Sequence, residues 1–407
     1  MQPLTFSDVF KPGTYPEHTY VDRISDDKMF SYEERLNMAL ALEGFLVCIT
    51  GPSKTGKTVL CEKVIGLDNI VSLNGNDFEK SGNFWGAIAI KAGIPLSGTQ
   101  GSTNTVNMPA ESIMQAVTQS YVVNKDVVVK YFIDNNKVLV LDDFHYASDE
   151  MQYEAACQLK DVIRRNFKAV VISLPHRSDD PLRLNPDLNG RIQFIELLPW
   201  TSEELIQIPQ KGFKKLNIQV NPEILSRMTL ESSNSPQLMQ YICFNINTAA
   251  KRQIIDTVTD ELLTLSCQIT TINLDCKAIV EHIKSGPFRR GQQRIKYKLV
   301  TGKEVDIYEL LLYIIAENPP HVKLSLGEIK NRSDILIVDV GQSPHIREGY
   351  SANKPTITKL RTALNKTQER LNHEKAFYNV IEWKDDCLYI LESLFLFYVR
   401  WSNWKER

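Results

Sequence analysis

Three features that would place this chain in a membrane or outside a cell are missing from its 407 residues. No apolar run approaches the ~20 residues of a membrane-spanning helix, and the longest candidate, Leu310–Ala316, is far shorter. Residues 1–30 have neither a basic start nor an apolar stretch, so they do not have the pattern of a secretory signal. The seven cysteines form no Cys-x-x-Cys pair, which argues against a zinc site or a disulfide framework. We expect a cytoplasmic protein with reduced thiols.

The chain as a whole also lacks a large surplus of positive or negative charge. The net charge is −2, which by itself points to no partner, and 43% hydrophobic with 24% charged residues is typical of a chain with packed cores. The length favours two or three domains. Basic residues gather in one run that contains no acidic residue, made of Lys284, Arg289, Arg290, Arg294, Lys296, Lys298 and Lys303.

The first half of the chain alternates short apolar runs with helical patterns, which predicts an α/β fold with a parallel sheet. Continuous apolar runs are typical of strands that are covered on both faces. The expected strands are Phe45–Thr50, Ile70–Leu73, Val138–Leu141, Ala169–Leu174 and Ile192–Leu197. We therefore assign residues 1–198 to a nucleotide-binding domain, on the motif described below.

Helical patterns dominate the second half. Residues 199–268 predict a small helical lid, and 269–303 a basic linker. Residues 304–407 predict three helices followed by a hairpin around Lys384-Asp385-Asp386, which is the order of a winged-helix domain. Aromatic residues between Phe395 and Trp404 are expected to close its core or to form a partner interface.

One motif carries most of the functional information. The eight residues after the first strand fit the phosphate-binding pattern Gly-x-x-x-x-Gly-Lys-Ser/Thr. Glycine permits the backbone angles with which such a loop turns its amides towards phosphate oxygens. The lysine supplies positive charge to the β and γ phosphates, the threonine hydroxyl binds magnesium, and the following helix directs its dipole at the anion. The residues are Gly51, Pro52, Ser53, Lys54, Thr55, Gly56, Lys57 and Thr58.

A second motif, Val138-Leu139-Val140-Leu141-Asp142-Asp143, ends a buried strand with two carboxylates. Parallel sheets bind ligands at the carboxyl ends of their strands. We expect Asp142 to hold magnesium together with Thr58, and Asp143 to act as the general base towards water. Aspartates at strand ends are also common turn residues, so this motif indicates a magnesium site only in combination with the phosphate loop.

Several weaker candidates follow. Arg191, before the last strand, could stabilise the γ-phosphate on a neighbouring subunit, or could be a solvated loop arginine. His176 and Arg177 follow the fourth strand, where a side chain could sense the γ-phosphate. His145 is more readily structural than catalytic. The run 284–303 and the expected helix over 356–371, which carries Lys359, Arg361, Lys366 and Arg370, could contact nucleic acid, or could be a basic linker and a solvated helix face.

Together the phosphate loop, the paired aspartates, the lid and the winged-helix order resemble the AAA+-related P-loop ATPases. The chain looks most like the STAND ATPases (signal-transduction ATPases with numerous domains), and the origin-recognition-like ATPases are similar in layout. The resemblance implies that Tyr20-Val21-Asp22-Arg23 packs against adenine and that Arg191 is an arginine finger. It also implies that Pro236, in Asn234-Ser235-Pro236, contacts the nucleotide from the lid, although the family's Gly-x-Pro has Asn234 in place of glycine.

The resemblance implies an ATP- and Mg²⁺-dependent switch that turns over slowly, oligomerises and engages a sensor or effector protein in trans, in signalling or antiviral defence. The absence of a guanine-specifying Asn-Lys-x-Asp favours adenine. A DNA-acting ATPase, such as an origin-recognition-like loader or a transposition helper, is the alternative, and its discriminating feature is the basic run. A nucleotide-dependent scaffold that hydrolyses nothing is a third reading. No membrane contact is expected.

Overall fold

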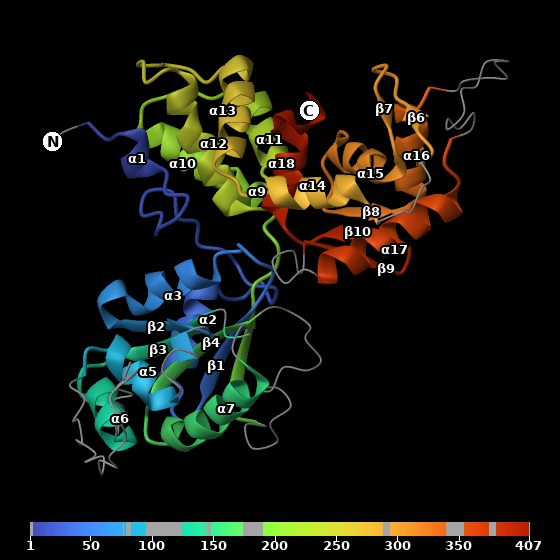
Figure 1. Cartoon of the computed structure of the whole chain (residues 1–407). Helices are drawn as coiled ribbons and strands as arrows, with labels where there is room; N and C mark the ends of the chain where they lie inside the picture. Colours follow the sequence, from blue (N-terminus) through green and yellow to red (C-terminus); the bar gives the residue numbers. More distant parts are fainter. Residues whose placement is uncertain are drawn as a thin grey trace, which may run out of the picture. The chain divides into compact units, whose positions relative to one another are not determined.

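The computed structural model describes residues 3–75, 77–78, 83–94, 124–142, 144, 148–173, 190–287, 294–338, 354–373 and 380–406. The chain forms two compact units (Figure 1). One consists of Asp22–Pro199, and the other joins Met1–Val21 to Trp200–Arg407. Within the described ranges, no helix is both long and apolar enough to cross a membrane.

The Asp22–Pro199 unit contains a five-stranded sheet in which all strands run parallel. All five strands lie where the sequence predicts them, within two residues at each end. Their order in space is not their order in the chain, because β4 lies between β1 and β3. The spatial order is β2 (Ile70–Asn74), β3 (Val138–Asp142), β4 (Lys168–Ser173), β1 (Leu46–Thr50) and β5 (Ile192–Glu196). The predicted α/β fold class is confirmed.

Two groups of helices cover the two faces of this sheet (Figure 1). Side chains alternate between the faces along each strand, so Leu139 and Leu141 join the core under α5, α6 and α7. Val138 and Val140 join the core under α2 and α3 on the other face. Both faces are therefore apolar, as the continuous apolar strands predict. The helices are α2 (Tyr32–Ala41), α3 (Lys57–Ile65), α5 (Phe84–Lys91), α6 (Lys125–Asp134) and α7 (Asp149–Ile163), and a 3₁₀ turn, η1 (Leu67–Asn69), follows α3.

The second unit begins after Pro199 with a helical region whose helices carry side-chain caps at several amino termini. Asn221 accepts a hydrogen bond from the Ile224 amide at 2.8 Å, and a proline follows it in the first turn, where its missing amide proton costs nothing. The helices are α9 (Ser202–Leu205), α10 (Gln207–Lys215), α11 (Pro222–Glu231), α12 (Pro236–Ala249), α13 (Asp260–Ile272) and α14 (Lys277–Ser285). This is the helical region that the sequence predicts after the sheet.

The amino-terminal segment packs on these helices. Its short helix α1 (Phe6–Val9) is followed by Phe10, whose ring lies 5.1 Å from that of Phe213 in α10. The Gln240 amide of α12 donates to the Thr19 hydroxyl at 2.7 Å. Residues 1–21, which the sequence analysis groups with the nucleotide-binding domain, thus share a core with the helical region. The four domain limits stay predictions.

The carboxy-terminal subdomain, residues 294–406, has the helix and hairpin order that the sequence predicts. A small sheet, β8–β10–β9, pairs antiparallel, and its hairpin turns at Asp385 and Asp386, which both have positive φ angles of 51° and 54°. The elements are β6 (Tyr297–Lys298), β7 (Glu304–Val305), α15 (Ile307–Ala316), β8 (Lys323–Ser325), α16 (Leu326–Leu336), α17 (Ile357–His373), β9 (Ile381–Lys384), β10 (Cys387–Ile390), α18 (Ser393–Trp401) and η5 (Asn403–Glu406).

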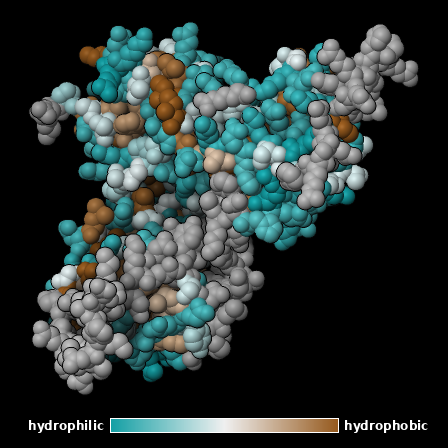
Figure 2. All heavy atoms as spheres, viewed as in Figure 1, coloured by the Kyte–Doolittle hydropathy of each residue, from teal (hydrophilic) through white to brown (hydrophobic). Residues whose placement is uncertain are grey.

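The aromatic residues near the carboxy terminus are core residues. Phe395 and Phe397 are fully buried, and Trp404 is 4% exposed. These three side chains confirm the expected closed core, and Tyr398 and Trp401 are partly buried against it. A partner interface stays a prediction. The viewed outer face of this subdomain is mostly hydrophilic (Figure 2).

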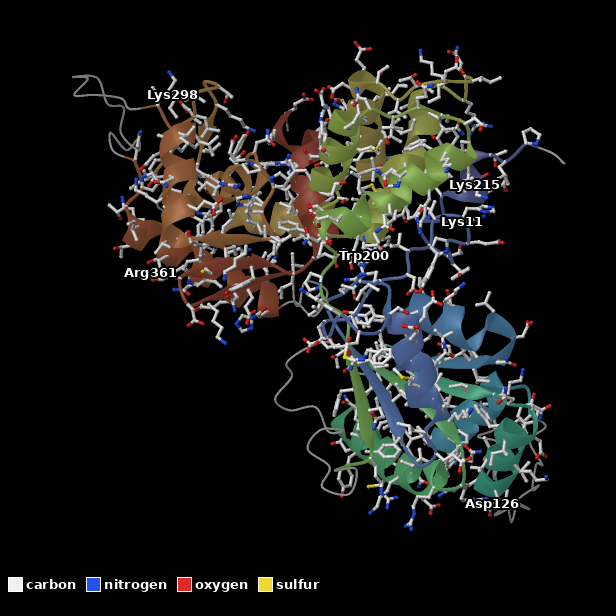
Figure 3. The ribbon with its side chains drawn as sticks, turned by 180° about the vertical axis from the view of Figure 1, so that it is seen from behind. Lys11, Asp126, Trp200, Lys215, Lys298 and Arg361 are labelled. Carbon is white, nitrogen blue, oxygen red and sulfur yellow. The ribbon has the colours of Figure 1, made fainter. Side chains whose placement is uncertain are left out.

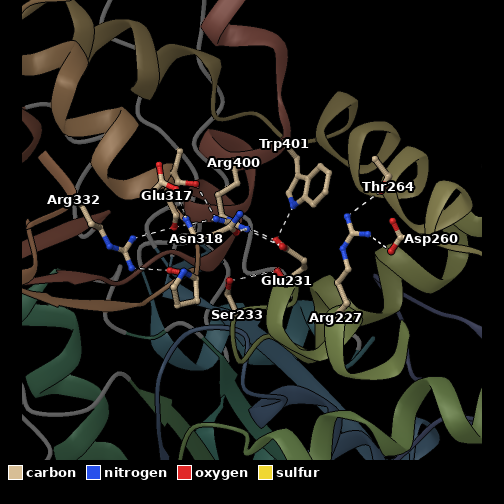
Figure 4. A network of polar contacts seen from close by, with 12 residues as sticks. Arg227, Glu231, Ser233, Asp260, Thr264, Glu317, Asn318, Arg332, Arg400 and Trp401 are labelled. Atoms are coloured by element: carbon tan, nitrogen blue, oxygen red, sulfur yellow. Dashed lines mark hydrogen bonds and ion pairs between the residues drawn. The ribbon is translucent and has the colours of Figure 1, made fainter. Parts of the chain in front are cut away.

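A buried ion pair ties α11 to α18 (Figure 4). Arg400 donates to both carboxylate oxygens of Glu231, at 3.0 and 2.7 Å, and the two side chains are only 6% and 5% exposed. The Trp401 indole donates to Glu231 at 2.8 Å. Arg400 also donates to the backbone oxygens of Ala316 and Glu317, at 2.8 and 3.2 Å. The helical region and the carboxy-terminal subdomain are therefore joined through satisfied buried charges.

Candidate nucleotide site

The phosphate loop connects β1 to α3, as the motif predicts. Gly51 has a φ angle of 151°, and a Cβ there would lie 2.6 Å from the backbone oxygen of Leu197. Gly56 has a φ angle of 95° and caps α3 without a side chain. Both positions require glycine, the first for close backbone approach and the second for its left-handed conformation. The amides of the first turn of α3 thus begin directly at the loop, as an anion site requires.

Lys57 lies inside this loop. Its ammonium donates to the backbone oxygens of Gly51 at 2.9 Å and Pro52 at 2.8 Å, and the residue is 8% exposed. The Thr55 hydroxyl also donates to Pro52, at 2.9 Å. The loop therefore encloses the Lys57 side chain, and the positive charge of this side chain lies at the centre of the loop.

Thr58 and Asp142 meet at the carboxyl edge of the sheet. The Thr58 hydroxyl donates to a carboxylate oxygen of Asp142 at 2.6 Å, although 84 positions separate the two residues in the chain. Hydroxyl and carboxylate oxygens are ligands that Mg²⁺ accepts in phosphate sites. The residues present fit a magnesium ion beside a polyphosphate. The Asp22–Pro199 unit is an α/β P-loop domain.

Glu62 adjoins this site and was not anticipated. It lies four residues after Thr58 on α3, so both side chains share one helix face. Burial, and then the charge of Asp142, raise the pKa of the Glu62 carboxyl. Burial likewise raises the pKa of the Cys61 thiol beneath. The helical spacing from Thr58 was the signal that could have identified Glu62.

Arg191 lies at the opposite edge of the sheet from the phosphate loop. Its backbone oxygen accepts from the Leu46 amide at 2.9 Å, at the amino ends of β5 and β1. The phosphate loop follows the carboxyl end of β1, five residues away, which corresponds to roughly 16 Å of extended chain. Arg191 therefore lies a full strand length away from the phosphate loop of its own subunit. Its role as an arginine finger stays a prediction.

The residues expected to contact adenine divide between the two units. Tyr20 and Val21 belong with the helical region, where the Tyr20 backbone oxygen accepts from Lys211 at 2.8 Å and Val21 is 4% exposed. Arg23 belongs to the P-loop domain and donates to the backbone oxygens of Leu198 and Pro199, at 2.8 and 3.2 Å. Their part in nucleotide binding stays a prediction.

The lid motif has the backbone that its sequence implies. Pro236 opens α12, and Ser235 caps that helix by accepting from the Leu238 amide at 3.3 Å. Asn234, at the position where the Gly-x-Pro motif of STAND ATPases has glycine, has a φ angle of 61°. Asparagine is among the residues that tolerate this left-handed region best, so the substitution preserves the turn. The nucleotide contact of Pro236 stays a prediction.

Four sequence-predicted residues, Asp143, His145, His176 and Arg177, lie outside the described residues, as do Arg289 and Arg290 of the basic run. The rest of that run is partly neutralised. Arg294 pairs with Asp306 at 2.7 Å, and Lys303 with Glu309 at 3.2 Å. On α17, Arg361 pairs with Asp386 at 2.7 Å.

Comparisons with known proteins give similarity of structure only. No protein-family description and no curated protein match the chain. A solved structure of Cdc6p from Pyrobaculum aerophilum is similar with a TM-score of 0.45 and 15% identity, over 97% of each chain. The Walker-type ATPase of Pyrococcus abyssi gives 0.47 and 10%, over 93% of this chain and 98% of that one. The RuvB Holliday junction branch migration motor of Thermotoga maritima gives 0.38 and 15%, over 65% and 78%. Similarity at this level carries no statement about the activity of this chain.

Proposed function

We propose that this protein is an ATP- and Mg²⁺-binding switch that hydrolyses ATP slowly. The observation that carries the proposal is the 2.6 Å contact between Thr58 and Asp142 beside the loop that encloses Lys57. A turn aspartate with no such function would have no reason to meet the last residue of a phosphate motif. The three side chains provide one concentrated positive charge and one pair of hard oxygen ligands at the start of a helix.

Each residue then has a separate task. The backbone N–H groups of the loop Gly51–Thr58, apart from Pro52 which has none, bind phosphate oxygens, and Lys57 turns from the backbone oxygens of Gly51 and Pro52 to the terminal phosphates. Thr58 and Asp142 hold Mg²⁺, which supplies charge stabilisation to the transferred phosphoryl group. Asp143 orients and deprotonates the attacking water. Arg191, at the far edge of the sheet, serves the site of an adjacent subunit, so hydrolysis depends on assembly.

The second unit supplies the response to the nucleotide. We propose that Pro236 contacts the base or sugar and that the segment 20–23 packs against adenine. Residues 199–268 form the lid, 269–303 a basic linker, and 304–407 a winged helix. Because Glu231 ends the helix that precedes the Asn234 turn and is paired with Arg400, the lid and the winged helix respond as one body. By resemblance, the setting is cytoplasmic signalling or antiviral defence, with an effector or sensor protein in trans. Reciprocity requires any partner that prefers the ATP form to tighten ATP binding.

A DNA-acting ATPase is the second candidate. It is favoured by Lys359, Lys366 and Arg370 of α17, which form no ion pair among the described residues. A DNA affinity that falls with salt, and falls further when Arg289, Arg290 and Arg294 are neutralised, would favour this function over the switch.

Calorimetry with Mg-ATP tests the nucleotide proposal. We expect the parent to bind one ATP per chain, and Lys57→Ala to weaken binding at least about 100-fold, because two charge-assisted bonds to phosphate are lost. Lys130→Ala, an exposed lysine on α6, is the matched control and should bind as the parent does. Equal affinities for parent and Lys57→Ala would contradict the assignment.

Turnover and size separate the functional candidates. Asp143→Asn should retain ATP but lose phosphate release, and a parent that releases no phosphate would instead be a nucleotide-dependent scaffold. Light scattering should give a larger particle with a non-hydrolysable ATP analogue than with ADP. Growth of the particle only when DNA is added would favour the DNA-acting function.

A further inference from the structure

The carboxy-terminal subdomain contains a cavity apart from the nucleotide site, and it shares Lys359 and Lys366 with the helix face that favours the DNA-acting function. It has a volume of about 220 Å³ and lies between the first half of α17 and the segment 294–297 with the first turn of α15. Its apolar lining comes from Ile295, Ile307 and Ala363, beside the tyrosines Tyr297 and Tyr308. Figure 3 shows the surrounding elements, with Lys298 on β6 and Arg361 on α17 labelled.

One wall of the cavity is held rigidly. The Arg294 guanidinium donates to the backbone oxygens of Ser285 and Pro287, at 2.5 and 2.7 Å, and to Asp306 at 2.7 Å. It also lies over the ring of Tyr308, 5.0 Å from the centroid. A Cβ on Gly286 would approach both Arg294 and Tyr308 to 2.6 Å, so this packing depends on glycine. The wall is preorganised, and the charge of Arg294 is compensated.

The facing wall carries charge that is not compensated. Lys359, Thr362 and Lys366 lie three and four residues apart, on one face of α17 that borders the cavity. Among the described residues neither lysine has an acidic partner within ion-pair distance, whereas Arg361 on another face has Asp386. One turn further, Arg370 contacts the Ser285 hydroxyl at 3.0 Å, and none of the described residues that line the cavity is acidic. The cavity is therefore positive at one side and apolar at the other.

This combination selects a class of ligand. Two ammonium groups and the Thr358 hydroxyl suit an anion with several acceptor oxygens, whereas the Thr362 hydroxyl already donates to the Thr358 backbone oxygen at 2.8 Å. The apolar wall suits a compact uncharged body. A space of about 220 Å³ suits a compact ligand such as a phosphorylated sugar.

We propose that this cavity binds a small phosphate monoester, with Lys359 and Lys366 on the phosphate and the Ile295–Ile307 wall on the organic body. The site is separate from the phosphate loop and does not depend on the function proposed for it. Helix α15 packs against α17, and its Ala316 backbone oxygen accepts a hydrogen bond from Arg400, the ion-pair partner of Glu231. A ligand bound beside α17 would therefore also stabilise the region around the Glu231–Arg400 pair.

The test is calorimetry with ribose 5-phosphate on the full chain carrying Lys57→Ala, so that binding at the phosphate loop is strongly weakened and no adenine nucleotide is needed. We expect one ligand per chain, and a loss of about 10-fold or more in affinity on adding Lys359→Gln and Lys366→Gln. The control adds Lys296→Gln and Lys298→Gln, exposed lysines of the neighbouring segment that do not line the cavity, with the same change of net charge. That variant should bind as the Lys57→Ala chain does.

Three outcomes would overturn the proposal. The first is no binding of ribose 5-phosphate to a chain with an unchanged melting profile. The second is an equal loss in both double-glutamine variants, which would indicate general attraction of anions. The third is tighter binding of an unphosphorylated single-stranded oligonucleotide that depends on Lys359 and Lys366, which would assign the surface to a nucleic-acid backbone.

Discussion

The pair Glu231–Arg400 allows a quantitative test of how the second unit is held together. In Arg400→Met, Glu231 keeps the indole hydrogen bond from Trp401 but loses both guanidinium bonds, and its carboxylate stays buried at 5% exposure. Removing one partner of a buried ion pair costs about 3–5 kcal/mol, because the remaining charge has no compensation. For a unit of this size, that loss lowers the melting temperature by about 6–20 °C.

The assay is differential scanning calorimetry of four variants: Arg400→Met, Glu231→Gln, the two combined, and Arg361→Met. Arg361→Met is the matched control, because its pair with Asp386 is about half exposed and should contribute less than about 1 kcal/mol. Adding Glu231→Gln to Arg400→Met removes the orphaned charge and should recover part of the loss, with a coupling energy of about 1–3 kcal/mol. A loss below about 1 kcal/mol for Arg400→Met, or strictly additive single effects, would refute the argument that these charges depend on each other.

Three further predictions concern the P-loop domain and the carboxy-terminal core. Gly51→Ala should destabilise the P-loop domain by at least about 1–3 kcal/mol, because the new Cβ meets the Leu197 backbone oxygen at 2.6 Å; an unchanged melting temperature would show that the loop can move aside. Arg191→Ala should still bind ATP in calorimetry yet lose phosphate release, and mixing it with Lys57→Ala chains should restore part of the activity; no restoration would contradict a role of Arg191 across subunits. Phe397→Ala should cost about 3–5 kcal/mol in urea unfolding, as expected for a fully buried ring, and a cost below about 1 kcal/mol would contradict its place in the core.

The local sequence predicted well those elements whose conformation depends on consecutive residues. The strands of the P-loop domain are continuous apolar runs, and glycine is the residue type that adopts the φ angles of 151° and 95° found at Gly51 and Gly56. The turn of the last hairpin was also readable, because two adjacent aspartates tolerate positive φ. The order of the carboxy-terminal helices followed from apolar periodicity in the same way.

Other features could not be predicted because they depend on pairs of distant residues. The sequence predicted no helix after the last hairpin, and only the structure shows α18 packed against α13 and α15. The grouping of residues 1–21 with the helical region depends on Phe10 meeting Phe213 and on Thr19 meeting Gln240. The cavity beside α17 exists only because the segment 294–297 crosses that helix.

By itself the sequence determined the phosphate loop, the apolar strands and the order of helices, since each of these is encoded in the conformational preferences of consecutive residues. The tertiary structure decided the rest. It placed β4 between β1 and β3, brought Thr58 to Asp142, set Arg191 at the opposite edge of the sheet, and buried Glu231 against Arg400. These contacts depend on which faces pack together and in what register, and no short stretch of chain contains that information.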